Sequence, residues 1–121
     1  MKSNDSLQDR LARYRGIHLS VVGRKSGQTI TIPVWFVVEG DRLLLLPVRG
    51  SETQWFKNLR RNPEIRISAR GKEGAFRARL LHGSKAVGGV VKKFRAKYGA
   101  GDVKKYYSNF DVAVLVPLRR G

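Results

Sequence analysis

Short β-type segments joined by tight glycine turns recur along this chain of 121 residues, and they constrain its fold more than any other feature. Residues 29–38 are rich in β-branched and aromatic side chains, and Gly40-Asp41 then predicts a hairpin turn into residues 42–48. Residues 64–70 alternate between apolar and polar side chains, and a glycine-containing turn leads to a partner strand over 75–82. Strands linked by such short turns pair antiparallel, so we expect a mainly β fold.

Two further strands are predicted over residues 18–23 and 110–116. Leu43 to Leu46 is apolar on both sides, as expected for a strand that is buried on both faces. Pro33 cannot donate to a ladder, so it predicts a sheet edge or a bulge. About six mostly antiparallel strands with flanking helices indicate an α+β barrel, because closure removes exposed sheet edges.

Helical patterns flank and interrupt these strands. They are predicted over residues 5–14, after the capping box Ser51-x-x-Gln54, after Ser84, and after Asp102 as a cap. Gly99 and Asn62-Pro63 are expected to end two of them. The side chains expected to face inward are Trp55, Phe56 and Leu59 in the second helix and Val87, Val90, Val91, Phe94 and Tyr98 in the third.

The chain is long enough for one core, and without repeats or linkers it is expected to form a single domain over residues 1–121. No apolar stretch is long enough to cross a bilayer, and the polar N-terminus does not resemble a secretory signal, which predicts a cytoplasmic protein. The absence of cysteine excludes disulfides, thiolate metal sites and cysteine nucleophiles.

A formal net charge of +16, from 25 Lys and Arg against 9 Asp and Glu, predicts attraction to polyanions. Nucleic acid, an acidic membrane surface contacted peripherally and a polyanionic small molecule all fit, as does a merely solvated basic face. Charge alone does not choose among them.

Two glycine-bounded turns are candidate anion sites. In Gly23-Arg24-Lys25-Ser26-Gly27, two cations and a hydroxyl join backbone N–H groups, although a basic hairpin loop would have the same composition. In Pro47-Val48-Arg49-Gly50-Ser51 a buried strand leads into a helix N-terminus, which is either an anion site or simply a capped helix.

Aromatic residues could complete a ligand pocket. Trp55 and Asn58 lie one helical turn apart and could face a planar ligand, while Tyr98, Tyr106 and Tyr107 could hold a substrate; each could also serve only in packing. His18 and His82 have no partners that suggest catalysis, and no spacing predicts a metal site. We therefore expect no catalytic side chain, and an enzyme of this kind would rely on a cofactor.

Ordered motifs make residues 17–117 similar to the deazaflavin-dependent nitroreductase family of the flavin/deazaflavin oxidoreductase superfamily. The similarity begins at Gly23-Arg24-Lys25-Ser26-Gly27-Gln28 and continues through Ile32-Pro33-Val34-Trp35 and Glu39-Gly40-Asp41. It is reinforced by the segment from Trp55 to Pro63, which matches the Trp-x-x-Asn-Leu and Asn-Pro pattern of the family.

The resemblance implies a split β-barrel of the FMN-binding, pyridoxamine-phosphate-oxidase-like type. It also implies coenzyme F420, a deazaflavin, as cofactor, with FMN as the alternative. By the same resemblance Arg24, Lys25, Ser26 and Asn58, with Gly27 closing their loop, belong to the phosphate side of the cofactor. Pro33, Val34 and Trp35 would border its ring together with Pro47, Val48, Arg49, Gly50 and the Trp55 helix.

The leading hypothesis is therefore an oxidoreductase that transfers a hydride to a small electrophilic acceptor, such as a quinone, an enone or a nitro compound. The alternatives are a non-enzymatic domain that binds single-stranded nucleic acid, and a carrier of a flavin-type cofactor without turnover. A homodimer is also expected from the resemblance to split barrels, although no self-association face stands out in the sequence.

Overall fold

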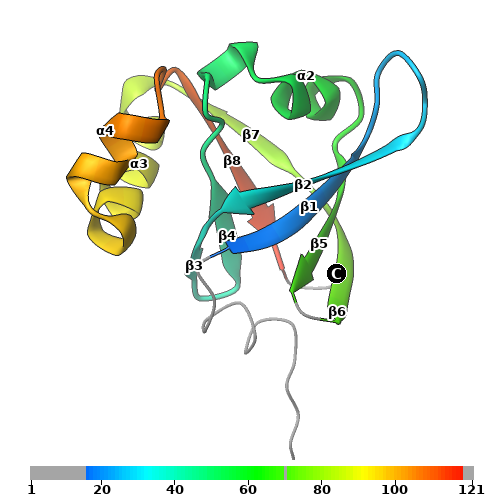
Figure 1. The fold of residues 1–121 in the computed structure, drawn as a ribbon, viewed down its shortest axis with the longest axis horizontal. Helices are drawn as coiled ribbons and strands as arrows, with labels where there is room; N and C mark the ends of the chain where they lie inside the picture. Colours follow the sequence, from blue (N-terminus) through cyan, green and yellow to red (C-terminus); the bar gives the residue numbers. More distant parts are fainter. Residues whose placement is uncertain (1–15, 70, 119–121) are drawn as a thin grey trace, which may run out of the picture.

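The computed structural model describes residues 16–69 and 71–118, which form a mainly β protein with two four-stranded antiparallel sheets and three α-helices (Figure 1). The first sheet has the order β2-β1-β5-β6, with β1 (Gly16–Val22), β2 (Thr29–Trp35), β5 (Glu64–Ala69) and β6 (Lys72–Arg77). The second has the order β3-β4-β8-β7, with β3 (Val37–Glu39), β4 (Arg42–Leu45), β7 (Arg79–His82) and β8 (Val112–Pro117).

Two strands that the sequence pattern predicts as single units are each divided between the sheets. The chain leaves β2 and enters β3 at Phe36, and it leaves β6 and enters β7 at Ala78. Phe36 is fully buried, and the backbone N–H of Ala78 donates to the carbonyl of Pro63 at 2.8 Å instead of to a ladder. The predicted count of six strands is therefore too low, and the described residues form two open sheets and not the closed barrel expected from the strand pattern.

The hairpin predicted at Gly40-Asp41 is confirmed, whereas the strand predicted from residue 75 begins earlier, at Lys72 of β6. Gly40 has a φ of 63° in the turn between β3 and β4, a conformation that glycine adopts without steric cost. Pro33 lies in β2, which is an edge strand of the first sheet, as the sequence predicts for a proline within a strand.

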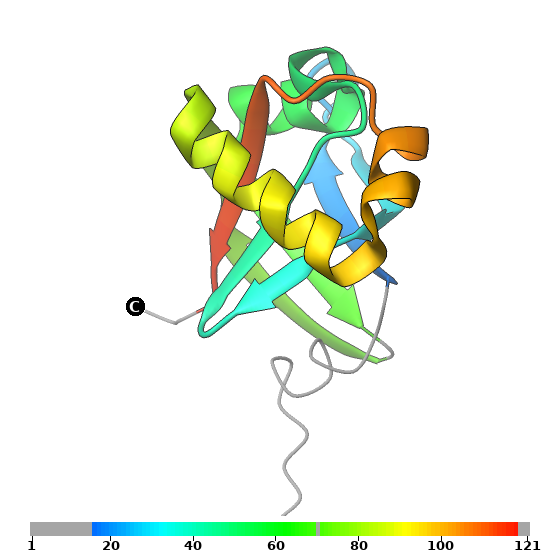
Figure 2. The ribbon, with the colours of Figure 1, turned by 90° about the vertical axis from the view of Figure 1, so that its left-hand side faces the viewer.

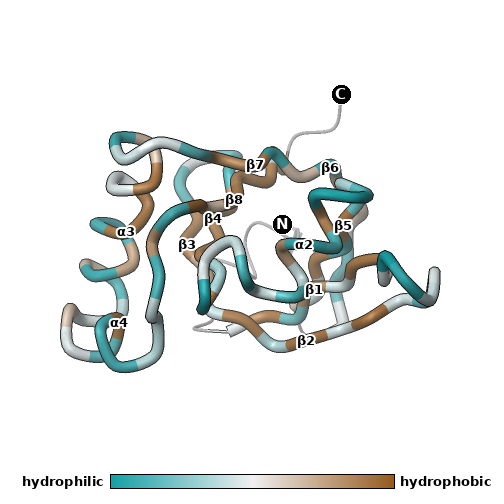
Figure 3. The backbone as a smooth tube through the Cα atoms, turned by 90° about the horizontal axis from the view of Figure 1, so that it is seen from above, coloured by the Kyte–Doolittle hydropathy of each residue, from teal (hydrophilic) through white to brown (hydrophobic). Residues whose placement is uncertain are grey.

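The core has two parts that share β4 and β8. Leu43 and Leu45 face the space between the two sheets, while Leu44 and Leu46 face the helices. This two-sided burial is what the run of four leucines predicts. Figure 3 shows the hydrophobic colouring of β4, and hydrophobic and hydrophilic segments that alternate along α3.

The helices cover two edges of this arrangement. α3 (Ser84–Tyr98) and α4 (Ala100–Tyr106) pack side by side on one flank (Figure 2), whereas α2 (Gln54–Arg61) lies across the top of the sheets in Figure 1. The predicted inward stripes are confirmed: in α2 they are Trp55, Phe56 and Leu59, and in α3 they are Val87, Val90, Val91, Phe94 and Tyr98. The predicted helix over residues 5–14 lies outside the described residues.

Two predicted helix starts are wrong. Ser51 does not cap α2: it belongs to a short 3-10 helix, η1 (Gly50–Glu52), and Thr53 precedes α2. The acceptor for Ser51 is Asp111, from a segment far away in the sequence. Asp102 does not precede its helix either, because Gly99, with a φ of 94°, both ends α3 and starts α4. No helix among the described residues is both long enough and apolar enough to cross a membrane.

Candidate functional site

A cavity of about 710 Å³ opens between the β1–β2 hairpin, the connection from β4 to α2, and the end of α4. This volume lies in the range typical of small-molecule and cofactor sites. The lining is mostly apolar and consists of Gly16, Ile17, His18, Ile32, Pro33, Val34, Trp35, Leu46, Val48, Thr53, Trp55, Tyr106 and Tyr107. The strand register explains one wall, because Gly16 pairs with Trp35, Ile17 with Val34 and His18 with Pro33.

Trp35 forms an aromatic wall of the cavity and is held from behind. Its ring stacks on that of Tyr98 with centroids 4.2 Å apart and planes 7° apart, and the ring of Tyr106 meets it edge-on at 5.6 Å. The Tyr98 hydroxyl donates to the Phe36 carbonyl at 2.9 Å and accepts from the Phe36 N–H at 3.1 Å. Tyr98 therefore supports Trp35 and does not itself line the cavity, unlike Tyr106 and Tyr107.

Tyr107 presents a buried polar group to this apolar space. Its side chain is only 6% exposed, it lines the cavity, and its hydroxyl makes no hydrogen bond within residues 16–69 and 71–118. Burial raises the pKa of the Tyr107 phenol above its ordinary value of 10, with a smaller contribution from Tyr98. The phenol thus remains protonated at neutral pH and is available as a hydrogen-bond donor.

The glycine-bounded loop after β1 is joined to α2 through Arg24. The Arg24 guanidinium donates from Nη1 to Asn58 Oδ1 at 2.7 Å and from Nη2 to Gln54 Oε1 at 2.8 Å, and its backbone N–H also donates to Asn58 Oδ1 at 3.1 Å. Asn58 is only 4% exposed, and in the described part of the chain its amide oxygen accepts from Arg24 alone. The structure brings these two residues together beside the first turn of α2, whose Trp55 lines the cavity.

The rest of this loop is a closed turn with a basic tip. The Gly23 N–H donates to the Gln28 carbonyl and the Gly27 N–H to the Gly23 carbonyl, while the Ser26 hydroxyl accepts from the Gln28 N–H. Lys25 is exposed at this tip, and its ammonium has no partner within the described part of the chain. Lys25, Ser26 and Gly27 lie outside the cavity lining.

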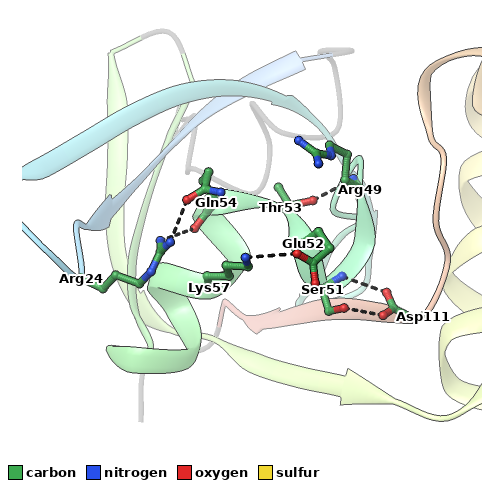
Figure 4. A network of polar contacts seen from close by, with 8 residues as sticks. All are labelled: Arg24, Arg49, Ser51, Glu52, Thr53, Gln54, Lys57 and Asp111. Carbon is green, nitrogen blue, oxygen red and sulfur yellow. Dashed lines mark hydrogen bonds and ion pairs between the residues drawn. The ribbon is translucent and has the colours of Figure 1, made fainter.

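The second glycine-bounded segment contributes to the opposite side of the α2 start, as Figure 4 shows for Arg24 and Arg49. Val48 lines the cavity, Pro47 is buried, and Arg49 is exposed with no partner for its guanidinium among residues 16–69 and 71–118. Gly50 has a φ of 58°, and a Cβ there would collide with Asp111 and Asn109. Pro47, Arg49 and Gly50 do not line the cavity themselves.

The cavity includes residues that the sequence reasoning missed. Gly16, Ile17, His18, Ile32, Leu46 and Thr53 all contribute to its lining. His18, which we expected to be structural, is exposed there opposite Pro33. The sequence does contain a signal for the β1 residues. If residues 18–23 and 29–38 pair as a hairpin around the Gly23–Gln28 turn, the start of the first strand must lie opposite Pro33-Val34-Trp35. No group of metal-ligating side chains occurs in the described ranges.

The model of the family described as F420H(2)-dependent quinone reductase matches residues 1–117. No curated protein matches the sequence significantly.

Solved structures share the fold at low sequence identity. An F420-H2 dependent reductase has 19% identity and a TM-score of 0.66 over 84% of this chain and 93% of its own. A candidate pyridoxamine 5′-phosphate oxidase from Listeria innocua has 17% identity and a TM-score of 0.64 over 91% and 88%. HutZ, a heme storage protein from Vibrio cholerae, has 13% identity and a TM-score of 0.73 over 100% and 93%. At these identities the likeness concerns the fold alone.

Proposed function

Because the chain belongs to the F420H2-dependent quinone reductase family, an oxidoreductase family whose cofactor is coenzyme F420, we propose that it reduces a small electrophilic acceptor by hydride transfer. The acceptor class is a quinone, an enone or a nitro compound. The single observation that carries this proposal is the apolar, aromatic-walled cavity of about 710 Å³ beside two cationic segments. The fold likeness to the pyridoxamine 5′-phosphate oxidase structure supports the split β-barrel implied by the sequence resemblance and does not bear on the reaction.

The residues present fit a planar ring with an anionic tail. Trp35, Pro33 and Val34 offer an apolar wall for the ring, and Trp55 closes the cavity beneath α2. At the start of α2, Arg24 and Arg49 lie on its two sides, and the helix N-terminus adds a partial positive charge. In this proposal Lys25, Arg49 and the loop backbone at Ser26 contact the tail, while Arg24 and Asn58 fix the loop that presents them.

The chain's own contribution is to bind, orient and shield. Bound in reduced form, the cofactor supplies the hydride. Trp35 and Val48 exclude water from one side of the reacting pair, and effective positioning of two reactants removes a large entropic cost. The Tyr107 hydroxyl is buried and has no hydrogen-bond partner among the described residues, and it donates a hydrogen bond to the oxygen of the substrate as negative charge develops there. The proton that completes the reduction comes from solvent, so no side chain acts as an essential acid.

The opening of the cavity favours an acceptor larger than the pocket itself. Val48 is 43% exposed and Tyr106 is 51% exposed, and both lie at the cavity lining. A flat quinone or nitroaromatic compound could rest between them with its remaining substituents in solvent. The nucleic-acid alternative is less well supported, because two of the three aromatic residues considered for stacking, Phe36 and Trp55, are buried, whereas Trp35 is partly accessible.

The experiment is a calorimetric titration of the protein with oxidised coenzyme F420, followed by anaerobic turnover of reduced F420 with a soluble quinone. We expect a Kd well below about 100 µM, where an ordinary cofactor site binds. Trp35→Ala should weaken binding, whereas Trp35→Phe, which keeps a ring on Tyr98, should retain most of it. Absence of binding would overturn the assignment, and binding without turnover of any acceptor would leave a cofactor carrier.

Two expectations about partners remain predictions. A homodimer is tested by light scattering of the full chain, and a peripheral contact with an acidic membrane by sedimentation with anionic vesicles at two salt concentrations.

A further inference from the structure

The connection from β4 to α2 forms one wall of the cavity and runs beside the segment that follows α4. Leu46, Val48 and Thr53 of this connection line the cavity, as do Tyr106 and Tyr107 at the end of α4. The two segments touch directly: the Ser108 N–H donates to the Val48 carbonyl at 2.9 Å, and Arg49 pairs with Asn109 in an isolated parallel bridge. An interaction that holds these two segments together therefore also fixes the cavity wall from the β4–α2 connection relative to the wall from the end of α4.

The side chain of Asp111 also joins these two segments. Its Oδ1 accepts the Ser51 N–H at 2.9 Å and its Oδ2 accepts the Ser51 hydroxyl at 2.5 Å (Figure 4). Both carboxylate oxygens are therefore used on one residue, 60 positions away in the sequence. Hydrogen bonds to an ionised acceptor are about twice as strong as those between neutral groups.

The turn is shaped around this carboxylate. Gly50 has a φ of 58°, and a Cβ at that position would collide with Asp111 Oδ1 and with the side chain of Asn109. The residue before the 3-10 helix η1 makes no side-chain cap hydrogen bond, and Asp111 instead accepts a backbone N–H of this helix from a distant segment. Only glycine at this position allows the carboxylate to approach so closely.

Further hydrogen bonds connect this turn to the start of α2. The Thr53 N–H donates to the Gly50 carbonyl at 3.0 Å, and the Thr53 hydroxyl accepts from the Arg49 N–H at 2.8 Å. Thr53 is the residue immediately before α2, and both it and Trp55 line the cavity. A shift of Ser51 would therefore move Thr53 and the first turn of the helix.

We infer that Asp111 is a positioning residue for the cofactor cavity. It does not line the cavity, and it acts by holding residues 47–53 against residues 108–111. This cavity wall then has its ligand-binding geometry already in the unliganded protein. This inference rests on the proposed function, because it concerns how that same cavity is preorganised. Preorganisation should be measurable as affinity, since an unfixed wall must be ordered on binding.

The test compares Asp111→Ala, Asp111→Asn and Ser51→Ala in the full chain, with Asp102→Ala as the matched control. Asp102 is an exposed carboxylate in the first turn of α4 and takes no part in the cavity lining. Three quantities are measured: the Kd for oxidised F420, the thermal midpoint, and hydrogen exchange of peptides covering residues 47–53 and 84–98. Asp111→Asn keeps one acceptor oxygen and Ser51→Ala keeps the backbone bond, so both provide milder changes if Asp111→Ala fails to fold.

We expect Asp111→Ala to weaken F420 binding about tenfold or more and to speed exchange in residues 47–53 while residues 84–98 stay protected. Asp111→Asn should recover part of the affinity, and Asp102→Ala should change neither quantity. A lower thermal midpoint with unchanged Kd would overturn the inference and leave a purely structural bond, as would unchanged exchange in residues 47–53. If the unaltered protein does not bind F420, the proposed function fails, and exchange alone then decides whether Asp111 fixes the wall.

Discussion

The indole of Trp35 lies flat on the ring of Tyr98, with centroids 4.2 Å apart and planes only 7° apart. Trp35 ends β2 at an edge of the first sheet, whereas Tyr98 ends α3 on the flank of the second. The Tyr98 hydroxyl also satisfies both backbone groups of Phe36, where the chain crosses between the sheets. One tyrosine thus supports the cavity wall and the strand crossing together.

Tyr98→Phe should destabilise the fold while leaving the ring stack in place. The change removes the hydroxyl that accepts from the buried Phe36 N–H at 3.1 Å, and an unsatisfied buried donor costs about 1–3 kcal/mol. Urea unfolding measures the loss. Tyr106→Phe is the control, because that side chain is half exposed and its hydroxyl makes no hydrogen bond in the described ranges. Equal stability of the two variants would contradict the role given to the Tyr98 hydroxyl.

Tyr107→Phe should lower turnover without destabilising the fold. The Tyr107 hydroxyl is buried without a partner among the described residues, so its removal should leave the free energy of unfolding unchanged or slightly raise it. If the hydroxyl donates to the acceptor oxygen, kcat/KM should fall by about tenfold or more. Anaerobic turnover of reduced F420 with a soluble quinone measures the loss, and F420 affinity should be unaffected.

The pH dependence of this step follows from the same burial. The pKa of Tyr107 is raised, so the phenol stays a donor and gives kcat/KM no alkaline limb below about pH 10. Because burial disfavours the phenolate, ionisation of Tyr107 favours the unfolded chain, and the free energy of unfolding falls as pH rises from the unfolded pKa toward the folded one. If kcat/KM of the unaltered protein fell near pH 8 and Tyr107→Phe abolished this fall, the phenol would ionise in that range, which would contradict its role as a hydrogen-bond donor.

Much of the local structure could be predicted because it follows from periodicity and turn chemistry. The run Leu43 to Leu46 indicates burial on both faces, and Val87, Val90, Val91, Phe94 and Tyr98 mark the buried stripe of α3. The hairpin at Gly40 depends on neighbouring residues alone. Each of these signals is local, so no knowledge of distant contacts is required.

The failures arise where a distant residue decides the outcome. Ser51-x-x-Gln54 has the spacing of a capping box, yet Ser51 bonds to Asp111 and Gln54 to Arg24. Nothing in the local sequence marks the crossing at Phe36, so residues 29–38 read as one uninterrupted strand. The backbone N–H of Phe36 is instead satisfied by the hydroxyl of Tyr98, 62 residues later. For the same reason Tyr98 could be placed near the pocket but not behind Trp35.

The bond between Asp111 and Ser51 predicts a pH-dependent contribution to stability. The Ser51 hydroxyl is the main cause that lowers the pKa of Asp111 below its ordinary value of 3.8. A lowered folded pKa gives stability that is present above the unfolded pKa and is lost as pH falls through the folded one. The difference in free energy of unfolding between the unaltered protein and Asp111→Asn should therefore shrink as pH falls from about 5 to 2. Urea unfolding across this range measures the change.

Arg24 and Lys25 are neighbours with the same charge, but the structure gives them different tasks. Arg24 is held by Asn58 and Gln54, so Arg24→Ala should lower the free energy of unfolding by about 1–2 kcal/mol and also weaken F420 binding. Lys25 has no partner among the described residues, so Lys25→Ala should leave stability unchanged and weaken only the binding, the more so at low salt. Titration with F420 at two salt concentrations, together with thermal unfolding, separates the two effects.

Lys85→Ala, which removes an exposed lysine at the start of α3, is the control for loss of net charge. If Lys25→Ala binds F420 as Lys85→Ala does, the loop tip does not contact the cofactor, and the anionic tail must be held by Arg49 on the other side of α2.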